Sequence, residues 1–251
     1  MQHSDKTTWD IDFLQDQRQT GSDNKYALII LNQDLSGGLL FKLWNATDWH
    51  CCADGGANRM HDALTKAGAR LESFVPDLIK GDLDSIRPDV KAFYESLSVP
   101  VVQDPSQYAT DLMKCIEAVE ELEQAQGTKY KIILLGGLSG RLDQTIHTMS
   151  YLHKLRQSRK WIFAVTEDNV GWVLDSGEHE IKIDHNLLGQ TCGLLPVGIE
   201  STLLSTSGLR WNLSEHESSF DGLVSTSNHL VPGHDVWIKT TKPIWWTVEL
   251  R

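Results

Sequence analysis

Six short apolar-rich runs in the first two-thirds of the chain constrain the fold more than any other feature. Each is four to six residues long, and its apolar residues mostly follow one another instead of alternating with polar ones. Strands of this kind are buried on both faces, as in a parallel sheet covered by helices. The six runs are Tyr26–Leu31, His50–Ala53, Asp77–Gly81, Val99–Gln103, Lys131–Leu135 and Trp161–Thr166.

Helical patterns separate these runs. After Thr110 and again after Asp143, apolar residues recur at spacings of three and four, which is typical of amphipathic helices. They are Leu112, Ile116, Val119 and Leu122 in the first, and Ile146, Met149 and Leu152 in the second. Glycine pairs at 55–56 and 136–137 follow strand candidates, where a tight turn into a helix needs glycine. We expect an α/β, Rossmann-like domain with a mostly parallel sheet.

The pattern changes near Asn169. The remaining segments are short, lack a helical period and are separated by Gly, Asn, Asp and Pro at intervals of roughly ten residues, which indicates an antiparallel sandwich. They are Trp172–Leu174, His179–Ile183, Cys192–Leu195, Gly222–Thr226, Val236–Lys239 and Ile244–Leu250. We therefore predict a loose polar tail over 1–23, an α/β domain over 24–168 and an all-β sandwich over 169–251.

Charge and cysteine content narrow the class of protein. The formal net charge is −11, and no run of Lys or Arg makes a local exception, so we expect no binding of nucleic acid through bulk electrostatics. An acidic chain can still bind a nucleotide if a metal ion bridges its carboxylates to the phosphates. No secretory signal or membrane-spanning run is expected. The four cysteines form no C-x-x-C pair, which favours buried, reduced thiols in a cytoplasmic protein.

The first motif that could form a functional site is Lys80-Gly-Asp-Leu-Asp-Ser85, at the carboxyl end of a predicted strand. Ligands of open α/β sheets bind at that edge. Asp82 and Asp84 are two apart, so in extended backbone their carboxylates face the same way, and a hard divalent cation such as Mg²⁺ would relieve their repulsion. The alternative is a solvated acidic turn, because Asp and Gly are ordinary turn residues.

Two further motifs also follow predicted strands. In Gln107-Tyr-Ala-Thr-Asp111, Asp111 either completes a ligand set with the first two aspartates or, like Thr110, caps the next helix. In Gly136-Gly-Leu-Ser-Gly-Arg-Leu-Asp143, backbone N–H groups suit an anion and Arg141 can add a phosphate contact, although a purely structural glycine turn remains open. Asp143 either caps the helix or assists the site.

The remaining candidates are Asp54 and a part of the predicted sandwich. Asp54 lies in Ala53-Asp-Gly-Gly-Ala-Asn58 at a strand end, where it reaches the same cavity or holds the glycine turn. Trp211, together with the hydroxyl and amide groups of Ser225-Thr-Ser-Asn228, suits a flat polar heterocycle. The alternative is a core tryptophan and a turn.

Taken together and in order, these segments resemble the thiamin pyrophosphokinase family from Tyr26 onward. The resemblance rests on motifs shared along the chain. This chain differs from animal members at Leu83, where animal members often carry Phe. It also differs in Gln107-Tyr-Ala, which lacks the His of animal members and is similar to fungal members. The motifs are Ile30–Gln33, Ala53–Arg59, Gly81–Pro88, Thr110–Asp111, Gly136–Arg141 with Asp143–Gln144, Cys192–Gly198, Gly208–Leu213 and Leu223–Asn228.

The resemblance implies transfer of a diphosphate group from ATP to thiamin in a homodimer whose active site lies between subunits. It implies that Asp82, Asp84 and Asp111 hold Mg²⁺. It places Asp54, Thr110, Arg141 and Asp143 around the nucleotide, and Gln107, Trp211, Ser225, Ser227 and Asn228 around thiamin. Two alternatives remain, a phosphohydrolase that uses the same aspartates to direct water and a non-catalytic thiamin- or nucleotide-binding module.

Overall fold

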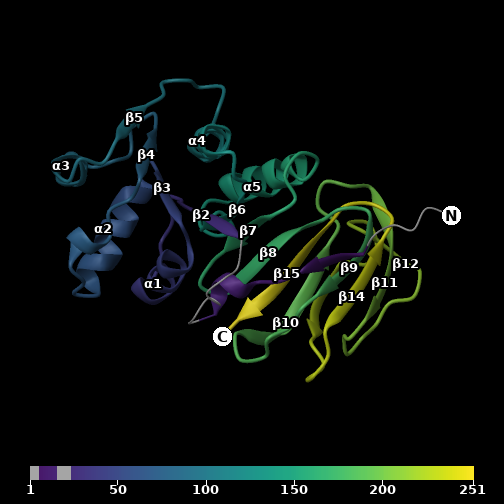
Figure 1. Ribbon diagram of the computed structural model, residues 1–251. Coiled ribbons are helices and arrows are strands. Elements are labelled where there is room, and N and C mark those ends of the chain that lie inside the picture. The colour runs from purple at the N-terminus through teal and green to yellow at the C-terminus, as the bar shows by residue number, and fades with distance from the viewer. Residues whose placement is uncertain (1–5, 16–23) are drawn as a thin grey trace. The chain divides into compact units, whose positions relative to one another are not determined.

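The computed structural model describes residues 6–15 and 24–251, which form two compact units (Figure 1). The α/β unit comprises Phe13–Thr145 and Ala164–Glu167, without the undescribed residues 16–23. The β unit comprises the described residues up to Asp12, Ile146–Phe163 and Asp168–Arg251. The predicted fold class is confirmed, because a parallel sheet with helices is followed by a β-rich part. No described helix is both long and apolar enough to cross a membrane.

The sheet of the α/β unit has the order β6-β2-β3-β4-β5, and each of these neighbours is parallel. Its strands are β2 (Lys25–Ile30), β3 (Trp49–Ala53), β4 (Leu78–Gly81), β5 (Val101–Gln103) and β6 (Tyr130–Leu135), and β7 (Ile162–Val165) follows β6. All six predicted strands are present, with ends shifted by no more than two residues. The apolar residues inside β2, β3 and β6 are buried, as continuous apolar runs predict, whereas His50 and Lys131 are half-buried.

Five α-helices accompany these strands within residues 24–251, and two of them, α4 and α5, match the predicted amphipathic segments. The helices are α1 (Gly37–Ala46), α2 (Gly56–Lys66), α3 (Pro88–Ser96), α4 (Asp111–Gln126) and α5 (Leu142–Leu155), with 3₁₀ turns η1 (Asp12–Leu14) and η2 (Leu71–Ser73). Local sequence explains their ends: Ser36 Oγ caps α1, Pro88 opens α3 and Gly127 closes α4 in the left-handed region. At Gly56 a Cβ would lie 2.2 Å from the Ile30 carbonyl oxygen, so only glycine lets α2 begin directly against β2.

The β unit contains strands from two sheets, with orders β1-β9-β14-β11-β12 and β13-β10-β15-β8. The strands are β1 (Thr7–Trp9), β8 (Asn169–Leu174), β9 (Gly177–Ile181), β10 (Leu188–Leu195), β11 (Ser201–Ser207), β12 (His216–Ser219), β13 (Ser225–His229), β14 (Val236–Thr240) and β15 (Ile244–Leu250). All pairs are antiparallel except β1 with β9. The Trp9 and Trp172 rings, one from each sheet, lie 5.7 Å apart, and Trp246, which is paired with Trp172, is buried on the same face of its sheet.

The prediction of a loose tail is wrong for the part of it that the structure describes. Thr7–Trp9 forms β1 and pairs with His179–Ile181, while Trp9 is 1% exposed and its Nε1 donates to His179 Nδ1 at 3.0 Å. Phe13, in the following 3₁₀ turn, is fully buried. A few large side chains thus order a segment whose overall composition is polar. The rest of the predicted tail, residues 1–5 and 16–23, lies outside the described residues.

All four cysteines are buried and free, as predicted. Cys51 in β3 and Cys115 in α4 lie closest, with their sulfur atoms 3.4 Å apart. Burial raises the pKa of the Cys51, Cys52 and Cys192 thiols, so these side chains act as small apolar groups in the core.

Candidate active site

The carboxyl ends of β3 and β4 carry the central candidates. Ala53 is paired with Lys80, so Asp54 and Asp82 follow neighbouring strands at the same edge of the sheet. Gly81 lies between them, and a Cβ there would be 2.6 Å from Asp54 Cβ and 3.0 Å from Asp111 Oδ1. The missing side chain of Gly81 therefore lets carboxylates from β3 and α4 approach the end of β4.

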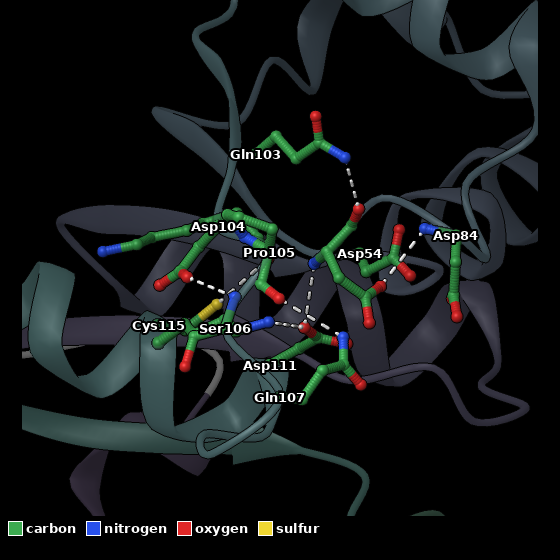
Figure 2. A network of polar contacts seen from close by, with 12 residues as sticks. Asp54, Asp84, Gln103, Asp104, Pro105, Ser106, Gln107, Asp111 and Cys115 are labelled. Atoms are coloured by element: carbon green, nitrogen blue, oxygen red, sulfur yellow. Dashed lines mark hydrogen bonds and ion pairs between the residues drawn. The ribbon is translucent and has the colours of Figure 1, made fainter.

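Asp54, Asp82 and Asp84 form the tightest carboxylate group at this edge, with one oxygen of each within 4.8 Å of the others. Figure 2 labels Asp54 and Asp84 of this group. Asp54 is buried, Asp82 is half-buried and Asp84 is exposed. Three carboxylates at this spacing repel one another unless a cation lies among them. Their oxygen ligands, open to solvent on the Asp84 side, fit a hard divalent ion that keeps some of its water ligands, as Mg²⁺ does.

Asp54 also organises the loop that carries the other two aspartates. Its Oδ2 accepts the Ser85 N–H at 2.9 Å and its Oδ1 accepts the Ile86 N–H at 3.0 Å. Burial raises the pKa of Asp54 against the opposite effect of these hydrogen bonds, and the negative charges of Asp111 and Asp82 raise it further. A cation at the cluster would favour the charged form of this carboxylate.

Asp111 is the first residue of α4 and lies against the cluster without belonging to its tightest group. Its Oδ1 accepts hydrogen bonds from the Asp82 N–H and from the Lys114 ammonium, each at 3.2 Å. Asp111 is labelled in Figure 2. A carboxylate at this position is also favoured by the helix dipole. The sequence groups Asp111 with Asp82 and Asp84, whereas the geometry adds Asp54 to those two and links Asp111 to them through the backbone of Asp82.

The loop before α4 holds Gln107 and Thr110. Gln107 is exposed and its Nε2 donates to the Pro105 carbonyl at 3.3 Å (Figure 2). Thr110 is the N-cap residue, yet its side chain makes no capping bond, and its buried Oγ1 has no hydrogen-bond partner among the described residues. A buried hydroxyl of this kind is costly unless a ligand or water satisfies it.

The glycine-rich turn after β6 is held by Gln33, which follows β2. Gln33 Oε1 accepts the Gly137 N–H at 2.8 Å and the Ser139 hydroxyl at 2.9 Å. At the end of the turn Arg141 donates two hydrogen bonds to Asp143, at 3.1 and 2.6 Å, and both side chains are exposed. These bonds lower the pKa of Asp143. Arg141 must therefore exchange this partner before the Nε–Nη2 edge of its guanidinium can bind a phosphate, whereas its Nη1 is not used by Asp143.

Trp211, Ser225, Ser227 and Asn228 belong to the β unit. Trp211 is 53% exposed, so the core alternative for it is wrong, and its ring lies against His229 and Arg210 at 5.1 and 4.9 Å. Asn228 is buried and its amide is committed to the backbone: Oδ1 accepts the Trp211 and His229 N–H groups, and Nδ2 donates to the Trp211 carbonyl. Asn228 thus fixes the turn that presents Trp211. Ser225 is buried, whereas Ser227 is exposed at positive φ.

Three side chains that hold parts of the candidate site were not predicted as site residues. Gln33 holds the glycine turn, Gln103 Nε2 donates to the Asp82 carbonyl at 3.0 Å, and Lys114 pairs with Asp111. Lys114 had a signal in the sequence only through its spacing, because it is three residues after Asp111 and side chains at that distance meet on a helix. The other two depend on strand register, which the sequence does not specify.

Acidic groups at the carboxyl edge of an open parallel sheet are typical of α/β enzymes, which bind their ligands at that edge. This chain is of that class and has a second, β-rich part. The family model "Thiamin pyrophosphokinase, catalytic domain" matches residues 40–164, and "Thiamin pyrophosphokinase, vitamin B1 binding domain" matches residues 178–245. The chain belongs to the thiamin pyrophosphokinase family, and the resemblance stated from its motifs is confirmed.

Relatives and solved structures agree with this assignment. Thiamine pyrophosphokinase 1 of Arabidopsis thaliana is 37% identical over 242 residues, covering 93% of this chain and 89% of the relative. Thiamine pyrophosphokinase of Saccharomyces cerevisiae is 28% identical over 276 residues, covering 91% and 86%. The crystal structure of yeast thiamin pyrophosphokinase matches with a TM-score of 0.85 at 26% identity, covering 98% of this chain and 91% of that one. Thiamin pyrophosphokinase from Candida albicans matches with a TM-score of 0.82 at 25% identity, covering 91% and 90%.

Proposed function

We propose that this chain transfers a diphosphate group from ATP to the hydroxyl of thiamin, giving thiamin diphosphate and AMP, with Mg²⁺ at the carboxylate cluster. The observation that carries the proposal is the convergence of Asp54, Asp82 and Asp84 at the carboxyl edge of the sheet, in a chain of this family. In this scheme Asp82 and Asp84 hold the metal ion together with Asp111, as the family resemblance implies, and Asp54 adds its negative charge to the same group. The ion supplies a positive charge for the phosphate oxygens.

The chain's own residues then position the reactants. Asp54 fixes the loop that carries Asp82 and Asp84 through its bonds to Ser85 and Ile86. Arg141, released from Asp143, binds a phosphate of the nucleotide, and the unpartnered Thr110 hydroxyl donates to the same ligand. Because diphosphate transfer moves charge among phosphate oxygens, placing and neutralising those oxygens accounts for most of the rate.

The thiamin side of the proposal involves the β unit and the loop before α4. The exposed Trp211 ring offers a flat surface for a heterocycle, and Asn228 holds that ring in place instead of contacting the ligand itself. Gln107, Ser225 and Ser227 supply polar contacts. Thiamin is a cation, so the net charge of −11 favours its approach. We also propose that the protein acts in the cytoplasm as a homodimer.

One assay separates this function from its alternatives. The purified chain is incubated with ATP and Mg²⁺, with and without thiamin, and AMP and thiamin diphosphate are quantified. AMP and thiamin diphosphate formed in equal amounts, and only with thiamin present, support the proposal. Phosphate release without thiamin indicates a phosphohydrolase. Thiamin binding without turnover indicates a binding module, and either result contradicts the transfer reaction.

A further inference from the structure

Lys114 is a buried cation next to the proposed metal site. It lies one helical turn after Asp111 on α4, is 1% exposed, and its Nζ is 3.2 Å from Asp111 Oδ1. A buried ammonium is costly unless it is paired, and the Asp111 carboxylate supplies that pairing for Lys114. Its partner is one of four aspartates gathered at the ends of β3 and β4.

The same contact affects the carboxylates. Asp111 Oδ1 already has two donors, the Lys114 ammonium and the Asp82 N–H, so its negative charge is partly compensated from inside the protein. A divalent cation bound by Asp111 would lie within about 8 Å of the ammonium, since carboxylate–Mg²⁺ bonds are about 2 Å long. The two positive charges would therefore compete for one carboxylate.

We propose that Lys114 is an internal counter-ion of the cluster: it compensates the aspartates while no divalent cation is bound, and so weakens their affinity for a free cation. Repulsion between the ammonium and a divalent ion about 8 Å away corresponds to about a fivefold change in affinity even at the dielectric constant of bulk water. With the proposed function, which this step assumes, the metal ion then binds well only together with the phosphates of the nucleotide.

A purely structural role for Lys114 predicts the opposite sign. If Lys114 only held Asp111 in place, its removal would loosen a ligand and weaken cation binding. Asp111, however, keeps the Asp82 N–H bond and its favourable position at the N-terminus of α4 when Lys114 is replaced. The carboxylate therefore stays in place while the competing charge disappears, and the affinity for a free cation rises.

The test measures Mn²⁺ binding to the full chain without nucleotide, by the loss of the free Mn²⁺ signal in electron paramagnetic resonance. Lys114→Met removes the charge at similar side-chain length, and Lys114→Gln keeps a hydrogen-bond donor in case the apolar variant fails to fold. We expect the Kd for Mn²⁺ to fall by about fivefold or more in both. An unchanged or raised Kd in either folded variant overturns the proposal.

Lys129→Met is the matched control. Lys129 also pairs with a carboxylate of α4, at 2.7 Å from Glu123 Oε2, but at the other end of the helix. We expect its Kd for Mn²⁺ to equal that of the wild type, and an equal tightening there would also contradict the counter-ion role. The readout needs no turnover, so absence of thiamin diphosphate formation would overturn the proposed function and leave the test of Lys114 intact.

Discussion

Gly81 is the residue at which strand, loop and helix meet. Its backbone ends β4, Asp54 Cβ and Asp111 Oδ1 crowd the position of its missing side chain, and Asp82 follows it directly. No conformational demand explains this glycine, since it is not among the positive-φ residues. The reason is space: only hydrogen at this position allows Asp54 and Asp111 to approach the end of β4 together.

Gly81→Ala should therefore disturb the carboxylate cluster more than the fold. Overpacking at such a site costs about 1–3 kcal/mol of unfolding free energy, and we expect at least a tenfold loss of activity, roughly what a small displacement of reacting groups causes. Denaturant unfolding and steady-state rates measure both. Gly38→Ala is the control, because a Cβ there meets only Ser36 Oγ at 3.9 Å in α1. Activity equal to wild type in Gly81→Ala would contradict the role of close approach.

The residue scale also shows what spacing can predict. The two-residue spacing of Asp82 and Asp84 at a strand end indicated a shared site, and both belong to one carboxylate group. The expected extended backbone is wrong, however, because the segment bends with Leu83 at positive φ and Asp84 N–H donates to Asp82 Oδ1. Asp54 joins them because Ala53 and Lys80 are in register, and a single sequence contains no information on register between strands. Asn228 was predicted to contact a ligand, but its amide is used by the backbone around Trp211, which only coordinates reveal.

At the scale of elements, apolar continuity was the reliable signal. The six strands of the first two-thirds were predicted because burial on both faces excludes polar residues from them. The prediction failed for β11 and β12, whose sequences are rich in Ser, Thr, His and Glu, and for β1, which has only three residues. The strand predicted at Gly222–Thr226 begins at Ser225, because Gly222 closes a turn from Ser219 and Leu223 forms only an isolated bridge with Ser218.

The pairing of β1 with the sandwich should depend on pH, because Trp9 of β1 is hydrogen-bonded to a histidine of β9. His179 Nδ1 accepts the Trp9 indole N–H and Nε2 lies 2.8 Å from the Asp175 carbonyl, so the ring must be neutral. Burial lowers the pKa of His179. A lowered pKa means that the folded state binds fewer protons than the unfolded state in this pH range. The contribution of neutral His179 to stability is therefore complete above about pH 6.5 and declines as the pH falls below that value.

We expect amide exchange in Thr7–Trp9 to accelerate as the pH falls from about 7 to 5, after correction for the intrinsic exchange rate. Hydrogen exchange with mass spectrometry measures this segment directly. His179→Gln, whose side chain can accept the indole N–H without titrating, should remove the pH dependence. An equal pH dependence in that variant would assign the effect to other groups.

At the scale of the whole molecule, the proposal requires two chains. The aspartates belong to the α/β unit and Trp211 to the β unit, and the proposed homodimer combines the aspartates of one subunit with the partner subunit's Trp211. Asp82→Asn and Trp211→Ala chains should each be nearly inactive at low thiamin concentration. Mixed after dissociation and reassociation, they should recover about a quarter of the wild-type rate, since half of the dimers then have one intact site of two.

The mixing experiment has a clear opposite outcome. If each active site is built from one chain, neither kind of site in the mixed dimer is intact and no activity returns. Size-exclusion chromatography of the mixture verifies that dimers have formed, so that an absence of recovery counts against the shared site and not against assembly.

The central claim, that the carboxylate cluster performs the transfer, is tested most directly by the rate of thiamin diphosphate formation in Asp82→Asn and Asp84→Asn. Each substitution removes a charge with almost no change in volume, and Asp84 is exposed, so we expect folded proteins with rates reduced by at least about a hundredfold. Wild-type rates in both variants at limiting Mg²⁺ would contradict the claim.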